Sequence, residues 1–133
     1  MLKDIVCRWI EKAKNDLEIA EIILGEGFHG ESAFHSQQAA EKALKALLVA
    51  LNMQPPRSHN IHLLLRLLEE RGIDTIVPRR IRAERLTVYA VETRYPDFGE
   101  EPSAEEAAEA LSLAKQVVEW AREKLKEMRI ECQ

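Results

Sequence analysis

The sequence is poor in residues that crosslink the chain or interrupt regular structure: it has two cysteines, five glycines, five prolines and 5% aromatic residues. Cys7 and Cys132 lie at opposite ends of the chain, so the sequence does not support a disulfide framework. The CxxC spacing that is typical of zinc sites is absent. The few glycines and prolines are clustered, and we interpret them as boundaries between regular elements.

Long apolar runs and an excess of basic residues are also absent. No stretch approaches the ~20 apolar residues of a membrane-spanning helix, and Met1–Glu11 has no signal-peptide pattern, so we expect a soluble, cytoplasmic chain. Nineteen basic and 23 acidic side chains give a net charge of −4, which excludes a generally basic nucleic-acid-binding protein. The 133 residues, 46% of them hydrophobic, suffice for one core and predict a single domain over 1–133.

Apolar residues recur at spacings of three and four, and no stretch alternates in the period of a strand. We therefore predict an all-α fold, an up-and-down bundle of five helices. Gly72 is placed to end the third helix, and Pro78 is tolerated in the first turn of the fourth. Ser103 and Glu106 have the capping-box spacing at the start of the fifth. The predicted helices span about residues 2–24, 31–51, 59–71, 78–95 and 103–128.

Short loops make successive helices antiparallel neighbours. The end of the second helix, the start of the third and the end of the fourth are therefore expected at one end of the bundle. The polar side chains in these three places are Lys45, Arg57, His59, His62, Arg94 and Tyr95. His35 precedes Lys45 by ~15 Å along the second helix, so we expect it outside this group.

Lysine, arginine and two histidines that titrate near neutral pH together suit a phosphate or another anion. The free backbone N–H groups at the start of the third helix would add to this preference. The alternative is purely structural: His59 caps a helix or lies in a loop, and Arg57 and Arg94 are solvated. The residues alone leave both interpretations open.

Arginines are concentrated in the middle of the chain. Residues 53–95 hold eight basic side chains, all of them arginines, against five acidic ones. Arg79, Arg80, Arg82 and Arg85 lie around the start of the predicted fourth helix, where positive charge opposes the helix dipole. Arginine binds phosphate well, but we favour the alternative that these side chains are solvated or form salt bridges with the acidic segment Asp97–Glu109.

Other candidate sites carry weaker signals. His29 and His35 lack carboxylate partners at a metal-ligand spacing, so we expect no metal and no cofactor. We interpret Trp9 and Trp120 as core or interface anchors, because a base-stacking surface needs several aromatic residues with basic neighbours.

Four stretches, residues 9–16, 34–48, 56–61 and 93–97, resemble the HEPN domain family in order and spacing. The second, with the sequence FHSQQAAEKALKALL, is the most specific. The resemblance covers essentially the whole chain and implies a five-helix bundle with a four-helix antiparallel core, which forms a homodimer. It also implies a nucleotide- or RNA-related role beside a minimal nucleotidyltransferase in a toxin–antitoxin pair. The positions that match the polar residues of the family's motifs, and are thereby implied to bind nucleotide or phosphate, are Lys42, Lys45, His59, Arg94 and Tyr95.

Some HEPN proteins are metal-independent ribonucleases, with an arginine followed after four to six residues by a histidine. One match occurs here, from Arg57 to His62, with His59 between them, whereas no histidine follows Arg94. Histidine can take the proton of a ribose 2′-OH or protonate the leaving oxygen, and arginine can stabilise the charged transition state.

Three functions remain open at this stage. The first is a nucleotide- or RNA-binding partner of a nucleotidyltransferase. The second is a ribonuclease toxin that uses Arg57 with His62 or His59, and the third is a non-catalytic helical interaction module.

Overall fold

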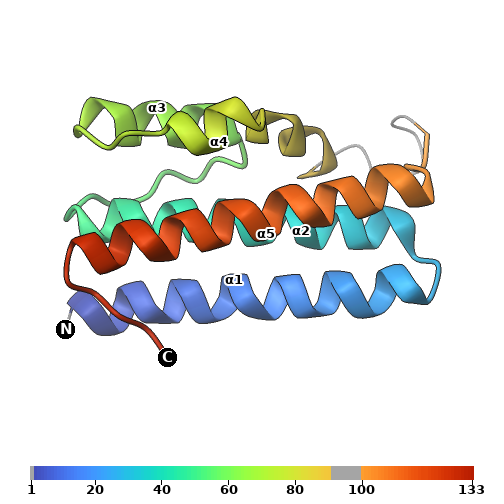
Figure 1. Ribbon diagram of the computed structural model, residues 1–133, viewed down its shortest axis with the longest axis horizontal. Helices are drawn as coiled ribbons and strands as arrows, with labels where there is room; N and C mark the ends of the chain where they lie inside the picture. The colour runs from blue at the N-terminus through green and yellow to red at the C-terminus, as the bar shows by residue number, and fades with distance from the viewer. Residues whose placement is uncertain (1, 91–99) are drawn as a thin grey trace.

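The computed structural model describes residues 2–90 and 100–133, and these residues form helices and no strand. The helices are α1 (Leu2–Gly25), α2 (His29–Ala50), α3 (Ile61–Glu70), α4 (Ile76–Arg80), the 3₁₀ helix η1 (Ala83–Ala90) and α5 (Ala104–Glu127). The predicted all-α fold is confirmed. In Figure 1, α1, α2 and α5 run side by side along the length of the molecule, and the shorter helices lie along one side.

Helix α2 is central to the bundle, since α1, α3, η1 and α5 all pack against it. Its sequence fits this position, because alanine, leucine and other small or apolar residues form a broad apolar face, and most of the helix is buried. The many alanines let neighbouring helices approach closely. At one such approach, the Ser32 hydroxyl donates to the backbone oxygen of Ala20 on α1 over 2.8 Å.

The helix ends follow the predicted chemistry in two places. The Ser103 hydroxyl accepts a hydrogen bond from the backbone N–H of Glu106, and the Glu106 carboxylate accepts one from the Ser103 N–H, which completes the capping box. Gly72 follows α3 with φ +86°, a conformation that glycine adopts without strain.

The prediction of one continuous fourth helix over 78–95 is wrong. The structure has the short helix α4 followed by η1, and Arg82 between them has φ +58°, in the left-handed region that no α-helix can contain. The helix also begins earlier than predicted, at Ile76, so that Pro78 still lies in its first turn. The end of the predicted helix, 91–95, lies outside the described residues.

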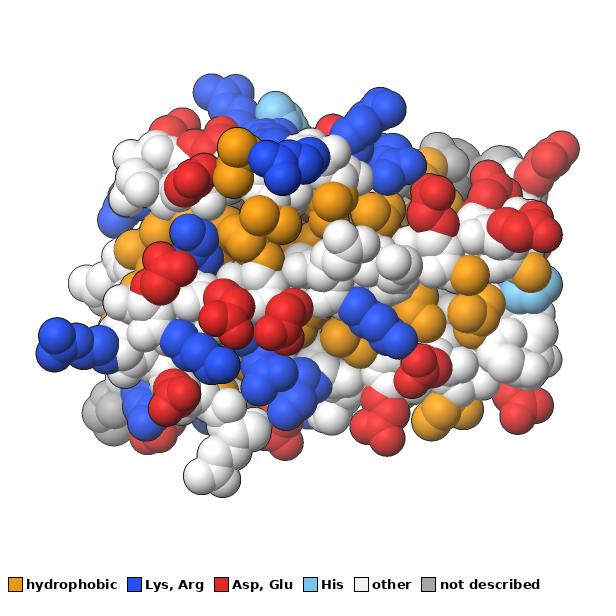
Figure 2. All heavy atoms as spheres, viewed as in Figure 1, with side chains coloured by type: hydrophobic (Ala, Val, Ile, Leu, Met, Phe, Trp, Pro, Cys, Tyr) orange, Lys and Arg blue, Asp and Glu red, His pale blue; other side chains and the backbone are white. Residues whose placement is uncertain are grey.

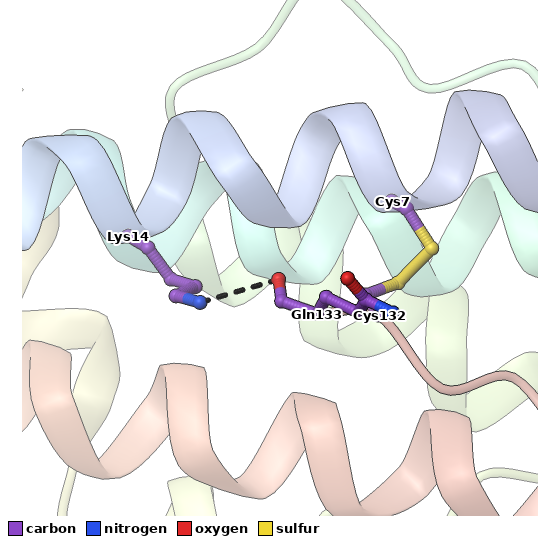
Figure 3. The surroundings of a disulfide bond; sticks show 4 residues. All are labelled: Cys7, Lys14, Cys132 and Gln133. Atoms are coloured by element: carbon purple, nitrogen blue, oxygen red, sulfur yellow. Dashed lines mark hydrogen bonds between the residues drawn. A yellow bond between two sulfur atoms is a disulfide. The ribbon is translucent and has the colours of Figure 1, made fainter.

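The two cysteines, for which the sequence did not support a disulfide framework, are paired in the structure. Cys7 and Cys132 form a disulfide across 125 residues of sequence, with their Cα atoms 5.3 Å apart. The chain turns after α5 at Arg129, whose φ is +64°, and the terminal segment runs back along α1. Lys14 Nζ donates to the backbone oxygen of Gln133 at 3.3 Å (Figure 3). The two cysteines can meet despite their separation in sequence, because the start of α1 and the end of α5 lie at the same end of the bundle (Figure 1).

None of the described helices combines the length and the hydrophobicity needed to cross a membrane.

Reduction of the disulfide is expected to lower the thermal stability of the protein. A crosslink that closes a loop of this length restricts the unfolded chain, and its loss typically costs about 2–4 kcal/mol, or ~10 °C in melting temperature for a domain of this size. Differential scanning calorimetry with and without dithiothreitol measures the effect. Cys132→Ser is the control, whose melting temperature should not respond to the reductant. Equal melting temperatures for the wild-type protein in both conditions would contradict the prediction.

Candidate functional site

Glu41, on α2, is a buried carboxylate with partners on both oxygens. Its exposed fraction is 4%. Oε2 accepts a hydrogen bond from Lys45 Nζ at 2.8 Å, and Oε1 contacts Nδ1 of His59 at 2.8 Å and accepts from Gln37 Nε2 at 3.1 Å. Burial raises the pKa of Glu41, but the hydrogen bonds from Lys45, His59 and Gln37 outweigh it, so the pKa lies below its ordinary value. We call these four residues the Glu41 cluster.

The ionised carboxylate fixes the state of the His59 ring. Because a carboxylate only accepts hydrogen bonds, the Nδ1 atom that faces Glu41 carries the hydrogen. The neutral ring therefore has its free lone pair on Nε2, on a side chain that is 54% exposed. Gln37 Nε2 also donates to the backbone oxygen of His59 at 2.9 Å, so one helix holds both the ring and the main chain of this residue.

The residues after His59 anchor it to the start of α3. Asn60, and not His59, is the N-cap: its side chain accepts a hydrogen bond from the Leu63 N–H at 3.1 Å. The Ile61 N–H donates to the Thr87 hydroxyl of η1 at 3.0 Å. His59 is therefore held between α2 and α3 without being used as a helix cap.

A groove of about 590 Å³ begins beside Lys45. Trp9 of α1, which is half-buried, contributes to its apolar lining, and the exposed Arg57 lines it as well. The groove thus combines an aromatic ring with two cationic side chains. Its full lining is Leu2, Ile5, Trp9, Lys45, Val49, Asn52, Met53, Gln54, Pro55, Pro56 and Arg57.

The structure brings together three of the residues predicted to share one end of the bundle. Lys45 and His59 are joined through Glu41, and Lys45 and Arg57 line the same groove. Arg94 and Tyr95 lie outside the described residues.

His62 belongs to a different set of contacts. Its Nδ1 lies 2.8 Å from Nη1 of Arg79, which also forms a two-point ion pair with Glu69 through Nε at 2.8 Å and Nη2 at 3.2 Å. The hydrogen bonds from Arg79 and from the Thr75 hydroxyl lower the pKa of Glu69 to about 2. Because Nδ1 of His62 accepts from Arg79, the neutral ring of His62 carries its hydrogen on Nε2, the reverse of His59. The contacts of His62 are thus with Arg79 and not with the Glu41 cluster.

The arginine-rich segment is partly neutralised. Arg79 pairs with Glu69. Arg85 pairs at 3.0 Å with Glu109, a residue of the acidic segment that we predicted to supply partners. Arg80 and Arg82 are exposed and have no ion pair among the described residues. In Figure 2, Lys and Arg side chains gather along the edge formed by α3 and α4, with Glu and Asp side chains among them.

A second buried carboxylate, Asp16 of α1, was missed as a site residue. Its Oδ1 contacts His35 Nδ1 at 2.8 Å, and its Oδ2 accepts from Lys42 Nζ at 2.6 Å. Burial raises the pKa of Asp16, but the hydrogen bonds from His35 and Lys42 lower it more, so it too lies below its ordinary value. We call these residues the Asp16 cluster. The sequence spacing around His35 did not indicate this partner, because Asp16 comes from the neighbouring helix α1.

One signal in the sequence could have identified Glu41. Gln37, Glu41 and Lys45 recur every four residues along a helix rich in alanine and leucine, so they form one polar row. The row is buried, with exposed fractions of 0%, 4% and 7%. Among the residues that the structure describes, no group of histidine, cysteine and carboxylate side chains could hold a metal ion.

Comparison with known proteins agrees with this architecture. The HEPN domain family matches residues 6–125. The chain belongs to the HEPN domain family.

Three relatives extend this assignment. A Methanocaldococcus jannaschii protein named "Putative toxin MJ1304" is 34% identical over 133 residues, which cover 90% of this chain and 87% of that protein. The crystal structure of TT1696 from Thermus thermophilus has a TM-score of 0.74 at 34% identity and covers 90% of this chain and 97% of its own. That of ST0689, an archaeal HEPN homologue, has a TM-score of 0.71 at 28% identity and covers 90% and 96%.

Glu41→Gln is expected to destabilise the protein at neutral pH by about 3 kcal/mol, because it leaves the ammonium of Lys45 buried without its counter-charge. The folded-state pKa of Glu41 is lowered, so its stabilising contribution is present above the unfolded value of 4.5 and is lost as the pH falls below it. The difference in unfolding free energy from wild type should therefore shrink between pH 7 and pH 3, as measured by urea denaturation.

Glu109→Gln is the matched control for this experiment. Glu109 pairs with Arg85 on the surface and its side chain is 63% exposed, so its loss should cost at most about 1 kcal/mol. A Glu41→Gln penalty that is as small as this control, or that does not change with pH, would contradict the prediction.

Proposed function

We propose that this chain binds RNA or a nucleotide at the groove and the Glu41 cluster, and that it is the toxin of a toxin–antitoxin pair. The observation that supports this most strongly is the buried carboxylate of Glu41, which contacts both His59 and Lys45, and Lys45 lines a groove together with Trp9 and Arg57. A nucleotide offers the two matching parts, a flat ring and a phosphate.

The apolar part of the groove suits a nucleobase. Trp9, which we interpreted from the sequence as a core or interface anchor, is half-buried and lines the groove with Lys45 and Arg57, so it can serve as a single stacking position with basic neighbours. Stacking of a base on an aromatic side chain is worth about 1–3 kcal/mol and tolerates any base. In this proposal the base contacts Trp9, and its phosphate is held by the guanidinium of Arg57 and the ammonium of Lys45.

Family membership and the relatives support the biological setting of the proposal. The Methanocaldococcus relative has the word toxin in its name. In the proposed setting, the chain forms a homodimer in the cytoplasm and its partner is a minimal nucleotidyltransferase. The disulfide is compatible with this location in organisms whose intracellular proteins retain disulfides, as those of hyperthermophiles do.

Binding is tested by fluorescence anisotropy with a short single-stranded RNA whose 2′-hydroxyls are methylated, so that it cannot be cleaved. Trp9→Ala and Arg57→Ala should each weaken binding about tenfold, the first through lost stacking and the second through a lost phosphate contact. Arg57→Ala should also reduce the slope of log K against log salt by about 0.7.

Arg85→Ala is the control for Arg57→Ala, because this arginine is exposed but paired with Glu109, away from the groove residues. It should leave both the affinity and the salt slope unchanged. If the wild-type protein binds neither RNA nor a mononucleotide at low salt, the proposal fails and the interaction module becomes the better account.

A second function, metal-independent ribonuclease activity, is favoured by the orientation of the His59 ring. Glu41 holds Nδ1, and Nε2 is left free on a half-exposed side chain. In the proposed step, Nε2 takes the proton of a ribose 2′-OH, and the 2′-oxygen attacks the adjacent phosphorus as the 5′-oxygen leaves with a proton from solvent. The products are a 2′,3′-cyclic phosphate and a 5′-hydroxyl. Arg57 would stabilise the charge on the phosphorus oxygens.

His59→Asn separates this role from a structural one. The Asn amide can replace Nδ1 as the donor to Glu41, but it has no counterpart of Nε2. We expect cleavage of unmodified RNA in the presence of EDTA to fall at least ~100-fold in this variant, since general-base catalysis contributes about that much. His62→Asn, at a histidine that contacts Arg79 and not Glu41, should retain activity. Equal loss in both variants, or none in His59→Asn, would contradict the assignment of the base.

A further inference from the structure

The Asp16 cluster repeats the chemistry of the Glu41 cluster without any role in the function proposed above. In each, a buried carboxylate contacts a histidine Nδ1 with one oxygen and a lysine Nζ with the other. Since Asp16 is also ionised, Nδ1 of His35 carries the hydrogen and Nε2 is left free, as in His59. The side chains of His35 and Lys42 are 29% and 27% exposed, so both reach the surface.

The two clusters lie on one face of α2. At about 100° per residue, four side chains fall within about 80° of one another around the helix axis: His35, Gln38, Lys42 and Lys45. Gln38 connects them, because its Nε2 donates to Gln37 Oε1 at 2.7 Å and to Glu41 Oε1 at 3.3 Å. From His35 to Lys45 this strip is ~15 Å long, and at Lys45 it joins the groove.

The charge of the strip suits an anionic strand. Each cluster is neutral when its imidazole is neutral and carries one positive charge when its imidazole is protonated. Lys42 Nζ has three hydrogens, of which one is used by Asp16 among the contacts of the described residues. Lys42 therefore has hydrogens left to donate to an anion, and His35 Nε2 adds a second donor when the imidazole is protonated. The ~15 Å length of the strip corresponds to about four nucleotides at the ~3.4 Å rise of a stacked strand.

We propose that the Asp16 cluster is a second phosphate subsite, where Lys42 and the protonated imidazole of His35 hold a phosphodiester of an RNA strand whose first nucleotide lies in the groove. The inference rests on the proposed function, and it specifies the ligand as an RNA strand rather than a single nucleotide. A mononucleotide is too short to reach from the groove to His35.

The alternative is a purely structural role, in which the cluster only joins α1 to α2. The two roles predict different effects of substitutions at His35 and Lys42 on RNA binding. His35→Asn keeps a donor for Asp16, because the Asn amide can replace Nδ1, and removes only Nε2. Lys42→Gln keeps a donor for Asp16 and removes the charge. If the cluster only joins two helices, neither variant should change the binding of RNA.

The test uses the full chain with two probes, a 2′-O-methyl RNA octamer and adenosine 5′-monophosphate. At pH 6, below the ordinary histidine pKa of ~6.5, we expect His35→Asn to weaken octamer binding about fivefold, as the loss of one hydrogen bond does, and to leave binding of the mononucleotide unchanged. Lys42→Gln should reduce the slope of log K against log salt for the octamer by about 0.7. Circular dichroism melts of both variants confirm that they are folded.

The outcomes separate the inference from the function on which it rests. If the octamer binds both variants as it binds wild type, while Arg57→Ala weakens it, the second subsite is wrong and the groove site stands. If both variants weaken the mononucleotide as much as the octamer, the effect is a structural one and the inference is overturned. If the wild-type protein binds neither probe, both proposals fail together.

Discussion

The ion pair and hydrogen bonds around Glu41 are the interaction on which the site depends. A carboxylate that is 4% exposed is costly to bury unless each oxygen has a partner, and here the partners are Lys45 and His59. The requirement acts in both directions. The segment that carries His59 must pack against α2 to satisfy Glu41, and Lys45 must keep its ammonium at the edge of the groove. The need of one buried carboxylate for hydrogen-bond partners therefore determines where the His59 imidazole and the Lys45 ammonium lie.

The packing of α2 explains why polar groups are held so firmly in an otherwise apolar bundle. Four helical elements pack around it, so polar side chains on its surface meet another helix or a loop rather than bulk water. Two sites result, one facing α1 through Asp16 and one facing the segment before α3 through Glu41. The strip defined above runs along α2 from one site to the other, and Gln38 and Lys42 in it are partly exposed.

Local signals in the sequence predicted the parts of the fold that depend on local chemistry. The periodicity gave the helices, and the Ser103–Glu106 spacing and Gly72 gave two of their ends. The left-handed residue at Arg82 was not predictable, because arginine has no preference for that conformation and only the packing of α4 and η1 imposes it. The Cys7–Cys132 disulfide was missed for a related reason: it depends on where two helix ends meet, which the local sequence does not encode.

The site was predicted in part. Lys45, Arg57 and His59 could be grouped from helix topology, because the direction of each helix determines which end it presents. Neither carboxylate was recognised, because the role of Glu41 and Asp16 depends on burial and on partners from other segments. The contact of His62 could not be predicted either: the residue matches a catalytic spacing in the sequence, but its Nδ1 contacts Arg79, which comes from another helix.

The central claim, that Glu41 fixes the His59 ring with Nδ1 protonated and Nε2 free, is tested most directly by the tautomer of that ring. Long-range ¹H–¹⁵N correlation spectra at about pH 9, well above the ordinary histidine pKa of ~6.5, distinguish the two neutral forms. The account predicts the Nδ1-protonated tautomer for His59 in the wild-type protein and a shift toward the Nε2-protonated form in Glu41→Gln. An Nε2-protonated ring in the wild-type protein would contradict it.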